Sequence, residues 1–176
     1  LGEQAKALVD FQRARAAYRQ AGIAGEVESL MLSLAVAYRR MGDAEQARRH
    51  FTQALQRMRA RGDWEGVATN LIQLGFLHEE SGTPEHALQP FQQALDVALA
   101  HQLPDTANSA LLGLAGAQIT LGQSEIALRT LERARHGFAA RQDTSSEDSL
   151  QLLTGQALAR QGRHVDALAH YRQAMP

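Results

Sequence analysis

The sequence predicts an all-α fold, a solenoid of antiparallel helix pairs. One set of apolar residues recurs with a constant period of 40 residues along the chain. Each copy contains a turn glycine, an alanine and a large apolar residue: Gly42, Ala47, Phe51; Gly82, Ala87, Phe91; Gly122, Ala127, Leu131; and Gly162, Ala167, Tyr171. A second alanine follows the large residue, and the spacings of four and three are those of one helix face. Repetition at periods of 20 to 50 residues is typical of solenoids.

The first residues of the chain carry a fifth copy of this pattern, with Ala7 and Phe11 in the places of the alanine and the large residue. Residues 1–23 are therefore predicted to be the second helix of a repeat whose first helix is missing. The chain begins with Leu1 rather than methionine. From both features we expect a fragment of a larger protein.

The first complete repeat is predicted over residues 24–63. Gly42 separates its two helices, because glycine tolerates the left-handed conformation that ends many helices. Asp43 is expected to cap the second helix, with Gln46 three residues later at the spacing of a capping box. Gly62 marks the next break.

Three further repeats are predicted at 64–103, 104–143 and 144–176, the last of them truncated. Thr83 followed by Pro84 favours a helix start, since proline is accepted in the first turn. Pro90 falls two turns into the same helix, where it removes a backbone hydrogen bond. We expect the helix to kink at Pro90. We also expect this position, which Thr130 holds in the next repeat, to be exposed.

A small residue also recurs in the first helix of each pair, at Ala35, Gly75, Ala115 and Gly155. We expect it to face the alanine of the second helix, so that the two axes approach closely. The large residue then fills the space toward the next repeat. A single pair cannot bury this apolar face alone, so stacking of repeats must bury it.

These residues resemble the tetratricopeptide repeat (TPR) family over essentially the whole chain. The family pattern of Leu-Gly, Tyr, Ala, aromatic and Ala is matched by Leu34, Ala35, Tyr38, Ala47, Phe51 and Ala54, and by Leu74, Gly75, Ala87, Phe91 and Ala94. The family's tryptophan position holds Met31, Leu71, Leu111 and Gln151. The 40-residue period exceeds the usual 34, and the proline at the repeat end is absent.

The resemblance implies a right-handed superhelix of about nine helices in which the first helix of each pair lines a concave groove. The long-repeat variety is similar to the Leu-Gly-Asn spindle-orientation adaptors and to the helical sensor domains of large bacterial regulators. Those relatives bind proteins or peptides, or sense ligands.

Composition excludes several other classes of protein. The formal net charge is −1 and there is no cysteine, which argues against bulk electrostatic binding of nucleic acid and against disulfides or cysteine-based metal sites. No apolar run is long enough to span a membrane, and no secretion signal opens the chain. We expect a cytoplasmic protein.

No group of residues predicts catalysis, a metal or a cofactor. His78 and His86 straddle a turn, and no histidine pairs with another ligand at the spacing of a zinc helix. Glu79 and Glu80 are adjacent, and adjacent helical side chains do not converge on one point. We expect a protein that is not an enzyme.

Charge is distributed unevenly. No lysine or arginine lies between Arg61 and Arg129, a stretch with eight acidic residues: Asp63, Glu65, Glu79, Glu80, Glu85, Asp96, Asp105 and Glu125. One interpretation is a solvated face. The other is an acidic surface that prefers a basic partner.

The resemblance places the groove on the fifth, sixth, ninth, twelfth and thirteenth residues of each repeat. The predicted partner-binding residues are Leu32, Val36, Arg40, Ile72, Phe76, Glu80, Leu112, Gly113, Gly116, Thr120 and Gln156. The fifth residue is always aliphatic, and the groove is expected to be apolar in the middle with charge at the rim, which suits an amphipathic helix or an extended segment with apolar anchors. Alternatively, the longer helices turn these side chains into the core. Gly113 and Gly116 indicate either close approach of a ligand or tolerated glycines.

The sequence thus predicts a non-enzymatic scaffold that binds a protein or peptide segment in its concave groove, without contacting nucleic acid or membrane. The alternative is a ligand-sensing regulatory domain fused to a transcription-regulator or signalling-enzyme output domain. Homo-oligomerisation through the groove or the uncapped ends is a further expectation, because solenoids need polar capping repeats for solubility.

Overall fold

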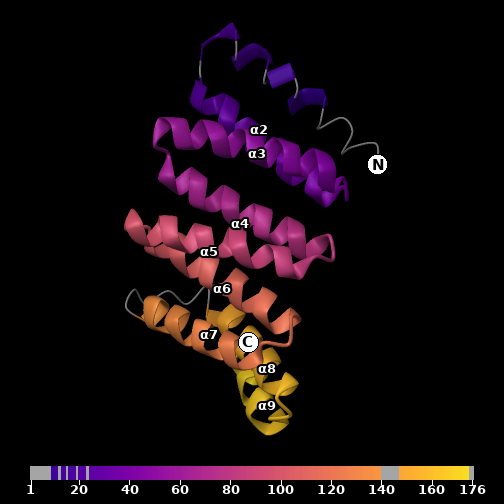
Figure 1. Ribbon diagram of the computed structural model, residues 1–176, viewed down its shortest axis with the longest axis vertical. Coiled ribbons are helices and arrows are strands. Elements are labelled where there is room, and N and C mark those ends of the chain that lie inside the picture. Colours follow the sequence, from indigo (N-terminus) through magenta and orange to yellow (C-terminus); the bar gives the residue numbers. More distant parts are fainter. Residues whose placement is uncertain are drawn as a thin grey trace.

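The computed structural model describes residues 24–139 and 147–174, together with 9–11, 13–14, 16–18 and 20–22. Every regular element in this part of the chain is an α-helix, as the sequence predicts. The helices stack in chain order from one end of an elongated molecule to the other (Figure 1). Within the described residues, no helix is long and apolar enough to cross a membrane.

The continuous helices are α2 (Ala24–Arg40), α3 (Ala44–Arg61), α4 (Trp64–Glu80), α5 (Pro84–Ala100), α6 (Pro104–Thr120), α7 (Ser124–Ala139), α8 (Glu147–Arg160) and α9 (His164–Gln173). The described residues between Val9 and Gln20 are helical too and belong to the predicted N-terminal helix. With it, the described part of the chain has the nine helices that were expected.

The turns follow the glycines. Gly42, Gly82, Gly122 and Gly162 lie inside the pairs with φ between 72° and 79°, and Gly62 lies between two pairs with φ 70°. The position equivalent to Gly62 in the next repeat is Gln102, which adopts φ 55° without being glycine. Its amide donates to the Leu99 carbonyl, and the Leu103 amide donates to the Ala98 carbonyl. This pair of bonds closes α5 in the manner of a glycine-terminated helix.

Aspartates begin two of the helices. The Asp43 carboxylate accepts from the Gln46 amide at 3.1 Å, and the Asp63 carboxylate accepts from the Gly66 amide at 3.0 Å. Each bond satisfies one of the amides that a helix leaves unpaired at its start. Thr83 does not cap α5 through its side chain; its hydroxyl donates instead to the His78 carbonyl at 3.1 Å.

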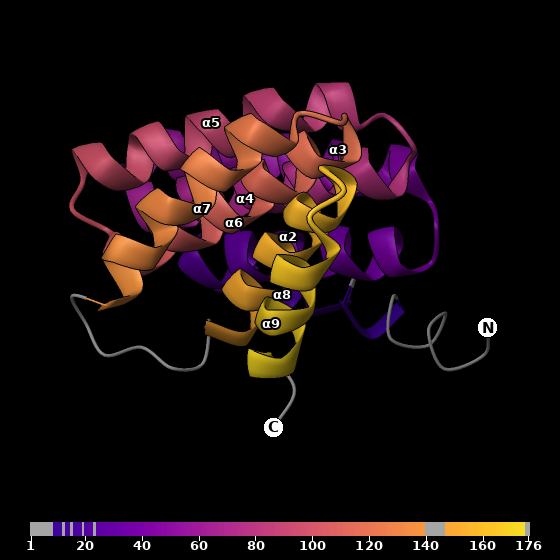
Figure 2. The ribbon, with the colours of Figure 1, turned by 90° about the horizontal axis from the view of Figure 1, so that it is seen from below.

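The two helices of each pair occupy different layers. Besides packing on their chain neighbours, α2 contacts α4, α4 contacts α6 and α6 contacts α8, whereas no such contact joins α3, α5, α7 and α9 within the described residues. The first helices are therefore closer together than the second helices. The stack must curve, with the first helices on the concave side, and Figure 2 shows α5 and α7 as the outer row over α4 and α6. The fold is the expected right-handed solenoid.

The large residue of each of the first three complete repeats lies in the core. Phe51 and Phe91 are completely buried, and Leu131 almost so. Glycine allows the closest packing: a Cβ built on Gly75 would lie 2.6 Å from the Phe91 ring. Gly155 has the same relation to Tyr171, at 2.5 Å.

The expectation of an exposed position at Pro90 and its equivalents was wrong. Helix α5 runs through Pro90, which is partly buried. Thr130, its equivalent in α7, is buried, and its hydroxyl donates to the Gln118 side chain at 2.9 Å. This position faces the first helix of its own pair.

The left-handed residue at the end of α5 predicts a stabilising substitution. Gln102→Gly relieves a conformation that costs a side-chain-bearing residue about 1–2 kcal/mol, offset in part by the greater freedom of glycine in the unfolded chain. We expect a gain of about 0.5–1 kcal/mol in the free energy of unfolding, measured by urea denaturation. Gly62→Gln is the matched control and should lose stability, because φ 70° is unfavourable for a residue with a side chain. The added Cβ would meet only the Trp64 ring nitrogen at 3.8 Å, so a clash would not contribute. A gain from both substitutions would contradict the explanation.

Candidate functional site

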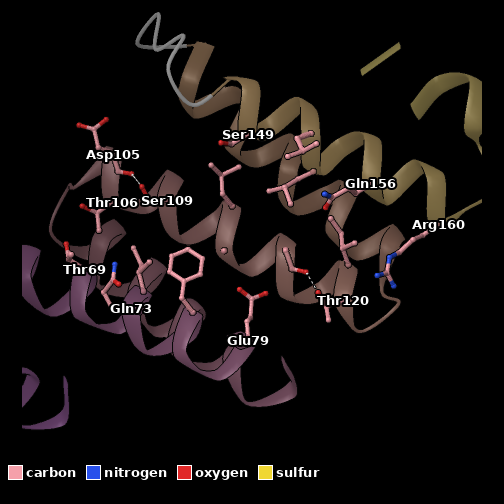
Figure 3. A pocket seen from close by; sticks show the side chains of 18 of the residues that line it. Thr69, Gln73, Glu79, Asp105, Thr106, Ser109, Thr120, Ser149, Gln156 and Arg160 are labelled. Atoms are coloured by element: carbon pink, nitrogen blue, oxygen red, sulfur yellow. Dashed lines mark hydrogen bonds between the residues drawn. The ribbon is translucent and has the colours of Figure 1, made fainter. Parts of the chain in front are cut away.

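The main hollow of the described residues is a groove of about 1040 Å³ on the concave face. Helices α4, α6 and α8 supply nearly all of its lining, and Tyr171 of α9 contributes at one edge. Each of the three helices therefore contributes from its equivalent face, one repeat after another. Figure 3 shows these side chains converging on the space between the three helices.

Seven of the predicted groove residues line this space: Ile72, Phe76, Leu112, Gly113, Gly116, Thr120 and Gln156. Leu32, Val36 and Arg40 line a separate hollow of about 480 Å³ on α2, together with Phe11. Glu80 lines neither hollow and instead pairs with the Arg39 guanidinium. Its neighbour Glu79 lines the main groove in its place.

The floor of the groove is apolar. Phe76 lies edge-on to the buried ring of Phe91, with 5.2 Å between ring centroids. Leu112 and Leu153 are likewise partly buried and pack on the main core. One face of each of these side chains therefore belongs to the core and the other to the groove. Leu152, at 46% exposure, is the most exposed large apolar side chain of the lining.

The two glycines of α6 have different roles. A Cβ on Gly113 would lie 2.3 Å from the Phe91 ring, so its lack of a side chain is required by core packing. A Cβ on Gly116 would meet only Glu79 Oε1 at 3.7 Å and Leu153 Cδ2 at 3.9 Å, which are ordinary contacts. Packing therefore explains Gly113 but not Gly116, which leaves open space in the groove.

Polar groups lie around this floor. Glu79 of α4 and Arg160 of α8 supply opposite charges, with Thr120 of α6 labelled between them in Figure 3. No hydrogen bond or ion pair within the described residues involves the Glu79 carboxylate. Burial raises the pKa of Glu79 above its ordinary 4.5, and the neighbouring charge of Glu80 raises it further. At the other end, the buried Oε1 of Gln73 has no hydrogen-bond partner in the structure.

Sequence reasoning missed Glu79, although the repeat register could have found it. Glu79, Ile119 and Ala159 are equivalent residues, the twelfth of their repeats, and all three line the groove. Equivalence also holds for Thr69, Ser109 and Ser149, which form a hydroxyl row. The 40-residue repeat would have identified these residues if it had been followed at every position of the first helix. No group of three or more potential metal ligands occurs in the described ranges.

Comparison with known proteins gives the same architecture. A family model described as tetratricopeptide repeat matches residues 26–100, and a second with that description matches residues 149–173. Together they cover more than half of the chain. No curated protein matches the sequence.

Solved structures resemble the fold at low sequence identity. The apo form of RapI has a TM-score of 0.85 at 15% identity over 98% of this chain, which covers 48% of RapI. A Rap protein complexed with Competence and Sporulation Factor has a TM-score of 0.78 at 14% sequence identity, and the match covers 98% of this chain and 58% of that one. BtubC from P. vanneervenii has a TM-score of 0.74 at 21% sequence identity, and the match covers 94% of this chain and 72% of BtubC. At these identities the likeness shows a common fold. This chain spans about half the length of RapI.

The two α6 glycines predict opposite effects of one substitution. Gly113→Ala must displace the Phe91 ring, and overpacking of a core costs about 1–3 kcal/mol. Gly116→Ala has room, and alanine is better than glycine inside a helix by up to about 1 kcal/mol. Urea denaturation should therefore show a lower free energy of unfolding for Gly113→Ala and a higher one for Gly116→Ala. Equal effects would mean that helix propensity alone decides both.

The Glu79 pKa predicts how stability changes with pH. A raised pKa means that the folded protein keeps this proton to higher pH than the unfolded chain does. The stability of the protein therefore falls as the pH rises from 4.5 through the raised pKa. Glu79→Gln removes that loss. The free energy of unfolding of the variant, measured by urea denaturation, should equal that of the natural protein in acid and exceed it near neutral pH. A difference between the two proteins that does not change with pH would contradict the assignment.

Proposed function

We propose that this chain, which belongs to the tetratricopeptide repeat family, is a non-enzymatic module that binds a segment of a partner protein in the groove between α4, α6 and α8. The observation that carries the proposal is the groove itself, which has a volume of about 1040 Å³, an apolar floor and polar groups around it. Ligand sites combine mostly apolar walls with a few placed polar groups in this way.

The shape of the groove favours an extended segment or a helix over a small compact ligand. The groove crosses three helices that repeat one orientation, and its volume is at the upper end of the 300–1,000 Å³ typical of small-molecule pockets. Side chains presented at intervals by a partner could each meet an equivalent position on successive helices. A helix or strand with apolar anchors fits this arrangement.

The polar groups do not suit a clamp for a terminal carboxylate. The asparagines of α4 and α6, Asn70 and Asn108, are buried in the core rather than in the groove. Arg160 is the single cationic side chain among the groove residues that the structure describes. We therefore propose binding through apolar anchors inside the partner segment rather than through its terminus.

The likeness to the Rap protein solved in complex with Competence and Sporulation Factor supports the proposal, since that protein shares the fold and binds a factor. A second copy of this chain is another partner consistent with the structure. Val165 and Leu168 of α9 are 84% and 47% exposed and form an apolar outer surface.

The groove can be tested with peptides selected from a phage-displayed library of random dodecapeptides. The affinity of the selected peptides, measured by fluorescence polarisation, should fall about tenfold or more in Leu152→Glu, which places a charge on the apolar floor at a cost of about 1.4 kcal/mol or more. Phe76→Asp should abolish binding but also weakens the contact with Phe91.

Leu99→Glu is the matched control for this experiment. Leu99 is 57% exposed on α5, outside the groove, so its replacement adds the same charge elsewhere. Equal loss in both leucine variants, or selection of no peptide above background, would overturn the proposed function.

A further inference from the structure

Glu79 differs from the other acidic groups of the concave face in having no partner. Glu80, the next residue, pairs with Arg39 across the α2–α4 contact. Asp105 has an interaction elsewhere. The Glu79 carboxylate is partly buried against the groove and makes no hydrogen bond or ion pair with a described residue. Removing a carboxylate from water without a partner costs free energy, and a bound cation would recover it.

The chain has no cation of its own near this carboxylate in sequence. The stretch between Arg61 and Arg129 contains no lysine or arginine, and it includes α4, α5 and α6 entirely. Arg160 lies on α8 at the other side of the groove and forms no ion pair with Glu79. No cation that the structure describes pairs with Glu79, so a cation of a bound partner would meet an unpaired carboxylate there.

The neighbourhood of Glu79 leaves space for a long side chain. Gly116 lies across the groove, where even an added Cβ would remain 3.7 Å from Glu79 Oε1. Leu153 and Phe76 bound the same space. Lysine and arginine cover apolar surface with their stems while their charged ends reach a polar group. The combination of a largely apolar groove and an unpaired carboxylate in its lining suits such a side chain.

We propose that Glu79 selects partner segments in which a lysine or arginine is flanked by aliphatic residues, the basic side chain entering beside Gly116 to pair with the carboxylate. This inference rests on the proposed function and adds the chemistry of the partner. The raised pKa of Glu79 agrees with it, because the desolvated charge gains most from a cation. The aliphatic flanks of the segment contact Ile72, Leu112 and Leu152, which are equivalent residues of α4, α6 and α8.

The first test is the composition of the selected peptides. The dodecapeptide library is selected against the natural protein, Glu79→Gln and Glu85→Gln. Glu85 lies on α5, is exposed and carries the same charge outside the groove. Peptides from the natural protein and from Glu85→Gln should be enriched in lysine or arginine between aliphatic residues. Peptides from Glu79→Gln should keep the aliphatic residues and lose the basic one.

The second test is a double-mutant cycle with one selected peptide and its analogue carrying norleucine in place of the basic residue. The exchange should weaken binding about tenfold or more to the natural protein, and about twofold or less to Glu79→Gln. Such non-additivity is the signature of a direct contact. Gly116→Ala should weaken binding of the basic peptide while raising the free energy of unfolding, a combination that a damaged fold cannot produce.

The outcomes separate this inference from the proposed function. If aliphatic peptides bind in the groove but the norleucine exchange has the same effect on both proteins, the groove function stands and the Glu79 assignment is wrong. Persistence of the basic residue in peptides selected by Glu79→Gln would also overturn it. Selection of no peptide would overturn the proposed function itself.

Discussion

The contact on which the rest of this structure depends is the ring of Phe91 against the backbones of two helices. A Cβ at Gly75 of α4 would lie 2.6 Å from that ring, and one at Gly113 of α6 would lie 2.3 Å from it. The ring therefore sets how closely α4, α5 and α6 approach. Phe76 packs edge-on against Phe91, so the floor of the groove rests on the same ring. The core and the floor of the groove are thus two sides of one layer of side chains.

Most of the fold was predictable from the sequence because its signals are local. Glycine permits a positive φ, and the alternation of alanine and large residues at helical spacing defines the buried face. Gln102 shows the limit, since nothing in its side chain indicates a left-handed conformation. Thr130 shows another: its burial depends on a hydrogen bond to Gln118, a residue of the preceding helix. Such a contact exists only once the pair has formed.

The sequence predicted which helices line the groove better than it predicted which of their residues do. Equivalent positions on successive first helices face the same side, which is why Ile72 and Leu112 were found. Adjacent helical residues point about 100° apart, and the choice between Glu79 and Glu80 depends on which one meets Arg39. That ion pair joins residues 41 positions apart. The spacing of residues along the sequence gives no indication of such a long-range ion pair.

Glu79 and Gly116 both depart from what stability alone would favour. An unpaired carboxylate in a partly buried place costs free energy, and a glycine with room for a methyl group gives up helix propensity. Departures of this kind from local consistency are expected at functional sites. The two residues lie next to each other across the groove, although they belong to different helices. Because Arg160 lies beyond them on α8, a bound segment would meet a negative group and then a positive one. If a segment binds there as we propose, these two charges would favour one of its two directions over the other.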